Sequence, residues 1–281
     1  MDFVYIVKKD EHNDDLRYSL RSIAKFYPKN RVWIVGYKPS WIQNVNYIPV
    51  KQTQDKWKNS ILNIQTACEC ENISEDFILM NDDFFCIDPL MSLEDLCNSN
   101  LDNLEVAIKH YRKRLSRWNK AFKQVYDLLE ELNIEKPYYN FEAHLPLQIN
   151  RKKYLEVMSL PKVQEFMKTK DVLHKRTLYK NYDKPKETIT LSSDIKLHQL
   201  KDDSLGRVKI CGWISVYDGQ VNNHNFSKLN KLLHTNFPNK CKYEVGFNEN
   251  KINPIIKNIQ NNQEVIISEK NNIHKDRFLH Y

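Results

Sequence analysis

The residues best suited to chemistry in this sequence are two adjacent carboxylates, Asp82 and Asp83, which follow Asn81. They lie between the apolar runs 77–80 (FILM) and 84–85 (FF), so they do not belong to an ordinary polar surface loop. Burying two carboxylates costs free energy unless cations or hydrogen-bond donors pair with them. Carboxylate oxygens bind hard divalent cations, and such a cation can bridge phosphate oxygens. We therefore predict metal or phosphate binding at this turn.

Two further pairs of side chains could act on a phosphate or a hydroxyl group. Arg17 and Arg21 share one face of a predicted helix, and guanidinium groups can form forks for phosphate oxygens. Glu142 and His144 alternate along an extended segment, so they should point to the same side. A carboxylate near an imidazole can serve as general base toward a hydroxyl. Surface arginines and a structural histidine are the alternative interpretations, and the sequence leaves both open.

The composition narrows the protein class. The chain has 281 residues, 41% of them hydrophobic and 11% aromatic, which indicates a folded domain with a substantial core. It contains neither a G-x-G-x-x-G nor a G-x-x-x-x-G-K-[ST] pattern, so Rossmann and P-loop sites are not expected. No apolar run reaches the length of a membrane span, so we expect no transmembrane segment. The six cysteines form no C-x-x-C pair and predict reduced thiols in a cytoplasmic protein.

Basic residues are concentrated in one stretch of a chain whose formal net charge is +7. Seven basic residues and no acidic one lie between Lys109 and Lys123. Positive charge early in a helix opposes the helix dipole, so helix stability does not account for the pattern. A solvated helix face would explain it, but Arg112, Arg114 and Arg117 could instead bind an anionic acceptor.

The elements that must position these residues alternate between strands and helices. Apolar and β-branched runs predict strands at 2–7, 31–36, 45–50, 76–80, 105–109 and within 208–217. Helical periodicity predicts helices at about 16–27, 55–70, 111–132 and 226–235. This order predicts an open, mostly parallel α/β sheet flanked by helices, with a helical insertion. Ligands bind at the carboxyl ends of such strands, which brings Lys8 and Asp82 to one cleft.

Four segments together resemble a known family, the Stealth proteins. These are 2–8 (DFVYIVK), 14–42 (DDLRYSLRSIAKFYPKNRVWIVGYKPSWI), 74–85 (SEDFILMNDDFF) and 141–154 (FEAHLPLQINRKKY), within roughly residues 2–158. The family includes bacterial capsule sugar-phosphate transferases and the animal transferase that makes the mannose-6-phosphate tag. The resemblance implies a GT-A-like fold, a nucleotide-sugar donor, Mg²⁺ or Mn²⁺, and transfer to a hydroxyl group.

The residue patterns above and this resemblance together predict roles for individual residues. Asp82 and Asp83 would hold the metal or the donor diphosphate, and Asp82 would join Glu142 and His144 as a catalytic residue. The residues near the donor would be Val7, Lys8, Arg17, Arg21, Asn59 and Asn81.

We expect one transferase domain over residues 1–250, with a donor half at about 1–110 and an acceptor half at about 111–250. Residues 251–281 would form a peripheral tail. Late in the acceptor half, Asp218 and His224 could complete a metal shell or contact the acceptor.

The expected activity is metal-assisted glycosyl transfer from a nucleotide-sugar to a hydroxyl, with a glycan as the default acceptor. Val7-Lys8-Lys9-Asp10 stands where Stealth proteins usually carry Trp-Val-Asp-Gly, which favours this over sugar-1-phosphate transfer. That transfer stays open as an alternative. So does a glycosyltransferase for hydroxymethylated bases in DNA, since the chain is basic. A third alternative is a sugar or nucleic-acid binding module without activity.

Overall fold

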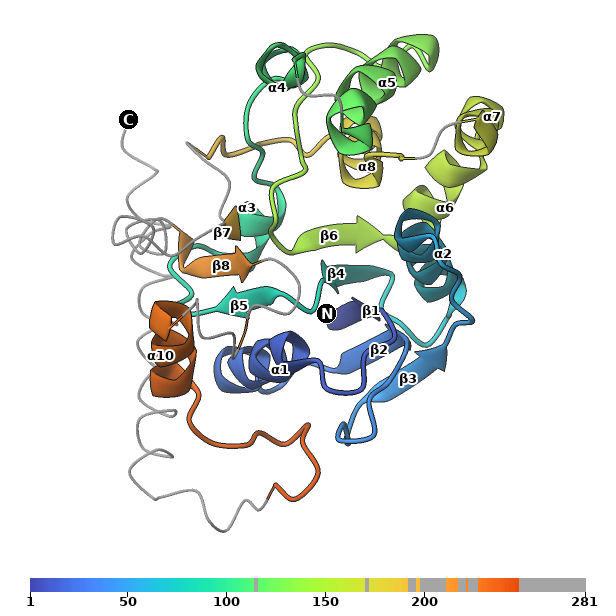
Figure 1. Ribbon diagram of the computed structural model, residues 1–281. Helices are drawn as coiled ribbons and strands as arrows, with labels where there is room; N and C mark the ends of the chain where they lie inside the picture. Colours follow the sequence, from blue (N-terminus) through green and yellow to red (C-terminus); the bar gives the residue numbers. More distant parts are fainter. Residues whose placement is uncertain are drawn as a thin grey trace.

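A five-stranded sheet forms the centre of the computed structural model, with helices on both of its faces (Figure 1). The structure describes residues 1–113, 116–169, 172–191, 196–197, 211–216, 221 and 227–247. None of the helices within these ranges is both long enough and apolar enough to cross a membrane.

The central strands follow the predicted order. They are β1 (Asp2–Val7), β2 (Val32–Gly36), β3 (Asn46–Pro49), β4 (Asp76–Met80) and β6 (Leu147–Asn150). The first four run parallel, β6 is antiparallel to β4, and the order across the sheet is β3-β2-β1-β4-β6. Because β1 pairs with both β2 and β4, the chain segments that leave these three strands emerge side by side.

Side chains on these strands alternate between two hydrophobic cores. Val4 and Leu79 pack into one core, which α2 (Lys56–Glu69), α5 (Arg117–Glu131) and α6 (Arg151–Ser159) cover. Tyr5 and Ile78 face the opposite core, which α1 (Asp14–Phe26) covers with Leu16, Leu20 and Ile23. The i, i+4, i+7 spacing of these three residues is typical of one face of a helix.

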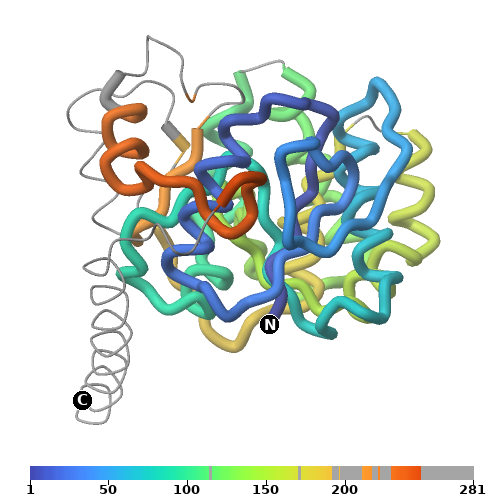
Figure 2. The backbone as a smooth tube through the Cα atoms, turned by 90° about the horizontal axis from the view of Figure 1, so that it is seen from below, coloured from blue at the N-terminus to red at the C-terminus, as the bar shows by residue number. Residues whose placement is uncertain are grey.

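A second, three-stranded sheet continues from the turn after β4. It contains β5 (Phe84–Cys86), β8 (Trp213–Val216) and β7 (Lys196–Leu197), in the order β5-β8-β7. Helix α10 (Ser227–Asn236) contributes Leu229 and Leu233 to a third apolar cluster that also contains Tyr18 of α1. Figure 2 shows the following segment, 237–247, lying against the N-terminal part of the chain.

The predicted insertion is helical but is divided differently. Its remaining helices are α3 (Leu93–Cys97), α4 (Leu104–Tyr111), α7 (Pro161–Thr169) and α8 (Lys175–Tyr182). The predicted strand at 105–109 is wrong, because α4 buries Leu104 and Ala107 while Val106 is exposed. The predicted single helix at 111–132 is also interrupted, since Ser116 caps a new helix by accepting a 3.2 Å hydrogen bond from the Asn119 backbone N–H.

Candidate functional site

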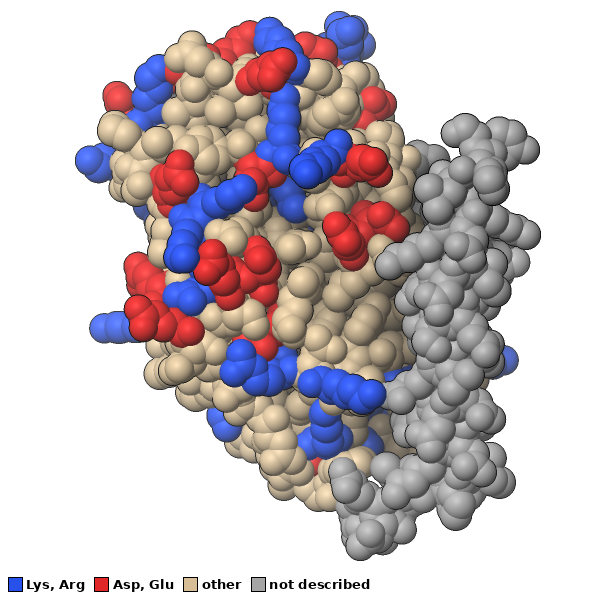
Figure 3. Space-filling view, turned by 180° about the vertical axis from the view of Figure 1, so that it is seen from behind, with Lys and Arg blue, Asp and Glu red and all other residues tan. Residues whose placement is uncertain are grey.

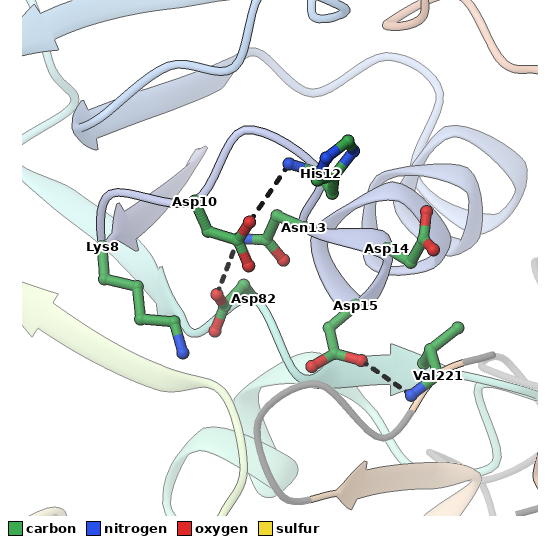
Figure 4. Close-up of a pocket in the computed structure, with 8 residues that line it drawn as sticks. All are labelled: Lys8, Asp10, His12, Asn13, Asp14, Asp15, Asp82 and Val221. Atoms are coloured by element: carbon green, nitrogen blue, oxygen red, sulfur yellow. Dashed lines mark hydrogen bonds between the residues drawn. The ribbon is translucent and has the colours of Figure 1, made fainter. Parts of the chain in front are cut away.

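A pocket of about 150 Å³ opens where β1 and β4 end and α1 begins (Figure 4). Its lining contains carboxylates together with a lysine, a histidine and an asparagine: Lys8, Asp10, His12, Asn13, Asp14, Asp15, Asp82 and Val221. The predicted convergence of the first and fourth strand ends therefore occurs, and the start of α1 closes the third side. Carboxylates accept hydrogen bonds from hydroxyl groups, so this lining suits a polyhydroxyl ligand.

Asp82 is fixed in this pocket by the residue that caps α1. Its Oδ2 accepts a 2.9 Å hydrogen bond from Asn13 Nδ2, while Asn13 Oδ1 accepts one of 3.0 Å from the Leu16 backbone N–H. Asn13 has a φ of 30°, in the left-handed region that asparagine tolerates better than most residues. The cap thus holds Asp82 at the positive end of α1, where a negative charge is favourable.

The neighbouring carboxylates are ordered by backbone groups. Asp15 Oδ1 accepts a 3.2 Å hydrogen bond from the Val221 N–H, and Asp10 Oδ1 accepts one of 3.1 Å from the His12 N–H (Figure 4). Asn13-Asp14-Asp15 is a helix-capping pattern, and the sequence prediction did not include it as a pocket wall. The signal was present in the consecutive acidic residues beside the cap.

Asp83 points away from this pocket toward the second sheet. It is 4% exposed, and its Oδ2 accepts a 2.8 Å hydrogen bond from Ser215 Oγ. The ammonium group of Lys196 lies 3.5 Å from the same oxygen. Asp83 therefore joins the end of β4 to β8 and β7.

The two expected metal ligands consequently do not form a common site. Asp82 faces the pocket and Asp83 pairs with Lys196, so their carboxylates diverge. Throughout the described part of the chain, no three His, Cys, Asp or Glu side chains are grouped as a metal site would require. The side chains at this turn therefore do not fit a divalent cation.

The predicted arginine fork is built, and it holds a carboxylate of the same chain. Arg21 Nε and Nη2 donate to Glu244 at 2.7 and 2.8 Å, and Arg17 Nη1 donates to the same group at 3.0 Å. Glu244 is 1% exposed. Burial raises the pKa of Glu244, but the hydrogen bonds from Arg21 and from the Cys241 N–H outweigh it, so the pKa is lowered overall. A phosphate would have to displace this carboxylate.

Glu142 is buried against the start of α8. Its Oε1 accepts a 3.2 Å hydrogen bond from the Thr177 N–H and lies 3.8 Å from Nδ1 of the fully buried His174. Burial raises the pKa of Glu142, yet the nearby positive charges, His174 first, lower it overall. Burial is the main reason that the pKa of His174 is lowered. His144, two residues along, is partly exposed.

The same end of α8 connects the segment of His144 to the acidic turn. Arg176 donates a hydrogen bond to the Leu145 carbonyl, and its guanidinium lies 5.6 Å from the centre of the Phe84 ring. Phe84 directly follows Asp83. The structure therefore brings the predicted catalytic segment and the acidic turn into one region.

The other predicted donor residues have local structural partners. Asn59 closes the loop before α2, because its side chain exchanges hydrogen bonds of 2.8 and 2.7 Å with the Thr53 backbone. The Val7 carbonyl accepts a 2.6 Å hydrogen bond from Gln52 Nε2. Neither residue lines the pocket; Asn81, at the end of β4, is partly exposed.

The possible acceptor residues lie elsewhere. Arg112 and Arg117 are exposed at the connection between α4 and α5, whereas Arg114, Asp218 and His224 lie outside the described residues. Acidic side chains are interspersed with basic ones on the face in Figure 3, so that face shows no continuous basic patch.

No protein-family model and no curated protein sequence matches this chain. Its structure is similar to that of the galactosyltransferase LgtC, solved in complex with donor and acceptor sugar analogs, with a TM-score of 0.50 and 12% identity over 89% of this chain and 98% of that one. It is also similar to the apo structure of the bifunctional glycosyltransferase WbbM, with a TM-score of 0.50 and 13% identity over 85% of this chain and 50% of that one. The predicted GT-A-like fold is confirmed, whereas membership of the Stealth family is not.

Proposed function

We propose that the chain is a glycosyltransferase that transfers a sugar from a nucleotide-sugar donor to a hydroxyl group. The observation that carries this proposal is the placing of Asp82 in an acidic pocket at the carboxyl ends of β1 and β4. Ligands of open α/β sheets bind at that edge. The shared fold with LgtC, which was solved with donor and acceptor sugar analogs, supports the same ligand class here.

In the proposed reaction, the bond between the anomeric carbon and the diphosphate oxygen breaks, and its electron pair leaves with the nucleoside diphosphate. The acceptor oxygen forms the new bond to that carbon and gives its proton to a base. Asp82 and its neighbours would accept hydrogen bonds from the sugar hydroxyls, and Lys8 would face the diphosphate. His144 is the proposed base, since α8 holds its segment close to the acidic turn.

A glycan hydroxyl is the proposed acceptor. The fold is shared with enzymes of sugar transfer, and the face in Figure 3, where acidic and basic side chains are interspersed, adds no support for a DNA acceptor. Sugar-1-phosphate transfer would leave phosphate on the product. Mass analysis of the product therefore separates these two reactions, and a retained phosphate would contradict glycosyl transfer.

The donor can be sought with a thermal-shift screen of nucleotide-sugars. A donor that binds only the folded chain at about 100 times its Kd stabilises it by about 2.7 kcal/mol, or several degrees in Tm. We expect at least one nucleotide-sugar to give such a shift and to be hydrolysed slowly when acceptor is absent. Asp82→Asn should lose both effects. A complete screen without a shift or hydrolysis would contradict the proposal.

A further inference from the structure

Each of the two aspartates of the acidic turn, Asp82 and Asp83, has a lysine from another element nearby. Lys196 places its ammonium 3.5 Å from Asp83 Oδ2, with the Lys196 side chain 15% exposed and that of Asp83 5% exposed. Lys8 and Asp82 line the same pocket, and Figure 4 shows the Lys8 side chain extending along that wall toward Asp82. The lysines come from different elements, one following β1 and the other in β7.

A divalent cation on Asp83 would compete directly with the Lys196 ammonium. Both would bind the same buried carboxylate, and like charges repel each other in a site with little water. Ser215 Oγ donates a 2.8 Å hydrogen bond to Asp83 Oδ2, which orients the Asp83 carboxylate toward β8 and away from Asp82. A metal ion at Asp83 would therefore have to displace the ammonium group or bind beside it.

From this geometry we infer that the chain supplies its own cations at the turn, with Lys196 neutralising Asp83 and Lys8 facing the donor diphosphate, so that donor binding requires no divalent metal. The part concerning the diphosphate rests on the proposed function. The part concerning Lys196 and Asp83 is independent of it. An ammonium group is a compact charge that binds phosphate oxygens and can offset the charge that develops on the leaving diphosphate.

The first experiment uses Mn²⁺ alone and needs no donor. Free Mn²⁺ is followed by electron paramagnetic resonance while the full chain is titrated into it. We expect the wild-type chain to leave the free signal unchanged at equimolar metal. Lys196→Met should raise the Mn²⁺ affinity at least about tenfold, because the competing charge is removed. Lys196→Arg keeps the charge and should behave as the wild type.

Lys152→Met is the matched control, since Lys152 forms an exposed ion pair with Glu75 at 3.1 Å. It should change nothing. The inference would be overturned if the wild-type chain binds one Mn²⁺ and the Asp83→Asn variant does not. Circular dichroism checks that Lys196→Met is folded. If the folded variant binds Mn²⁺ no more tightly than the wild type, the role of Lys196 is overturned. If that variant does not fold, the comparison of wild type with Asp83→Asn still decides.

A second experiment tests the diphosphate. The Tm shift given by a nucleotide-sugar should persist in EDTA and be lost in Lys8→Met, with Lys152→Met again unchanged. A shift that vanishes in EDTA and returns with Mn²⁺ overturns the inference. A chain that responds to no nucleotide-sugar in either condition contradicts the proposed function, whereas the Mn²⁺ titration still decides whether Lys196 excludes a metal.

Discussion

Asp82 and Asp83 are adjacent in the sequence but face different surroundings. Asp82 contacts the cap of α1, whereas Asp83 contacts Ser215 in the second sheet. Both residues lie in the turn between two strands, β4 and β5, and each side chain contacts a different element on leaving that turn. A shared metal at both carboxylates, as predicted from the sequence, would require the two side chains to face one point.

Replacing Asp82 by asparagine is expected to lower the rate of sugar transfer by about a hundredfold or more, since a positioned charged group is lost from the pocket. The fold should persist, because the amide can still accept the hydrogen bond from Asn13. Initial rates at one fixed donor concentration, the same for each variant, measure the effect. Asp76→Asn is the matched control, because Asp76 lies exposed at the opposite end of the same strand. Equal rates for both variants would remove Asp82 from the site.

Glu244 is expected to contribute stability that depends on pH. Its folded-state pKa lies below the ordinary value of 4.5, because the Arg21 and Cys241 hydrogen bonds outweigh the effect of burial. Its contribution is therefore complete above about pH 4.5 and is lost as the pH falls through the lowered pKa. Glu244→Gln should lower the free energy of unfolding by about 3 kcal/mol at neutral pH. It should also weaken the fall of that free energy at acid pH. Urea unfolding at several pH values measures both, with the exposed Glu165→Gln as control; parallel curves for wild type and Glu244→Gln would contradict the prediction.

At the scale of elements, short sequence patterns predicted the helices and strands that neighbouring residues determine. Buried runs specified β1, β2 and β4, and the apolar spacing specified α1. The run at 105–109 has too few residues for its period to distinguish strand from helix, and the packing of Leu104 and Ala107 decided for α4. The pocket at the strand ends followed from topology. The partners of the candidate residues, Glu244 and Lys196, could not be predicted because they are distant in sequence and carry no local signal.

Gly36 shows how closely the ends of β1 and β2 approach each other. Its φ is +111°, and an added Cβ would lie 2.4 Å from the Val7 carbonyl oxygen, a backbone atom that cannot move alone. Gly36→Ala should cost about 2 kcal/mol or more, combining strain and a clash. Gly246→Ala is the control, since Gly246 has a φ of +80° but its nearest neighbour is the flexible end of Lys240 at 3.3 Å. The urea midpoint of Gly36→Ala should lie well below that of Gly246→Ala. The reverse order would contradict the predicted clash.

At the scale of the whole molecule, the late segment 237–247 belongs structurally with the beginning of the chain. The Gln43 N–H donates to the Tyr243 carbonyl at 2.9 Å, and the Val245 N–H donates to the Trp41 carbonyl at 2.9 Å. Together with the Glu244 contacts, these bonds join the predicted donor half to the end of the predicted acceptor half. The two predicted halves are therefore joined by direct contacts between residues far apart in the sequence.

This arrangement gives different expectations for two shortened chains. A chain ending at Asn250 keeps every contact of segment 237–247, so its Tm should lie within about 2 °C of the full-length value if 251–281 is peripheral. A chain ending at Lys240 loses Glu244 and leaves Arg17 and Arg21 without their buried carboxylate. Losing the buried partner of these arginines should lower the free energy of unfolding by about 3 kcal/mol. At a few degrees per kcal/mol, the Tm should fall by about 10 °C. Differential scanning calorimetry compares the two, and a large fall already at Asn250 would show that the tail belongs to the domain.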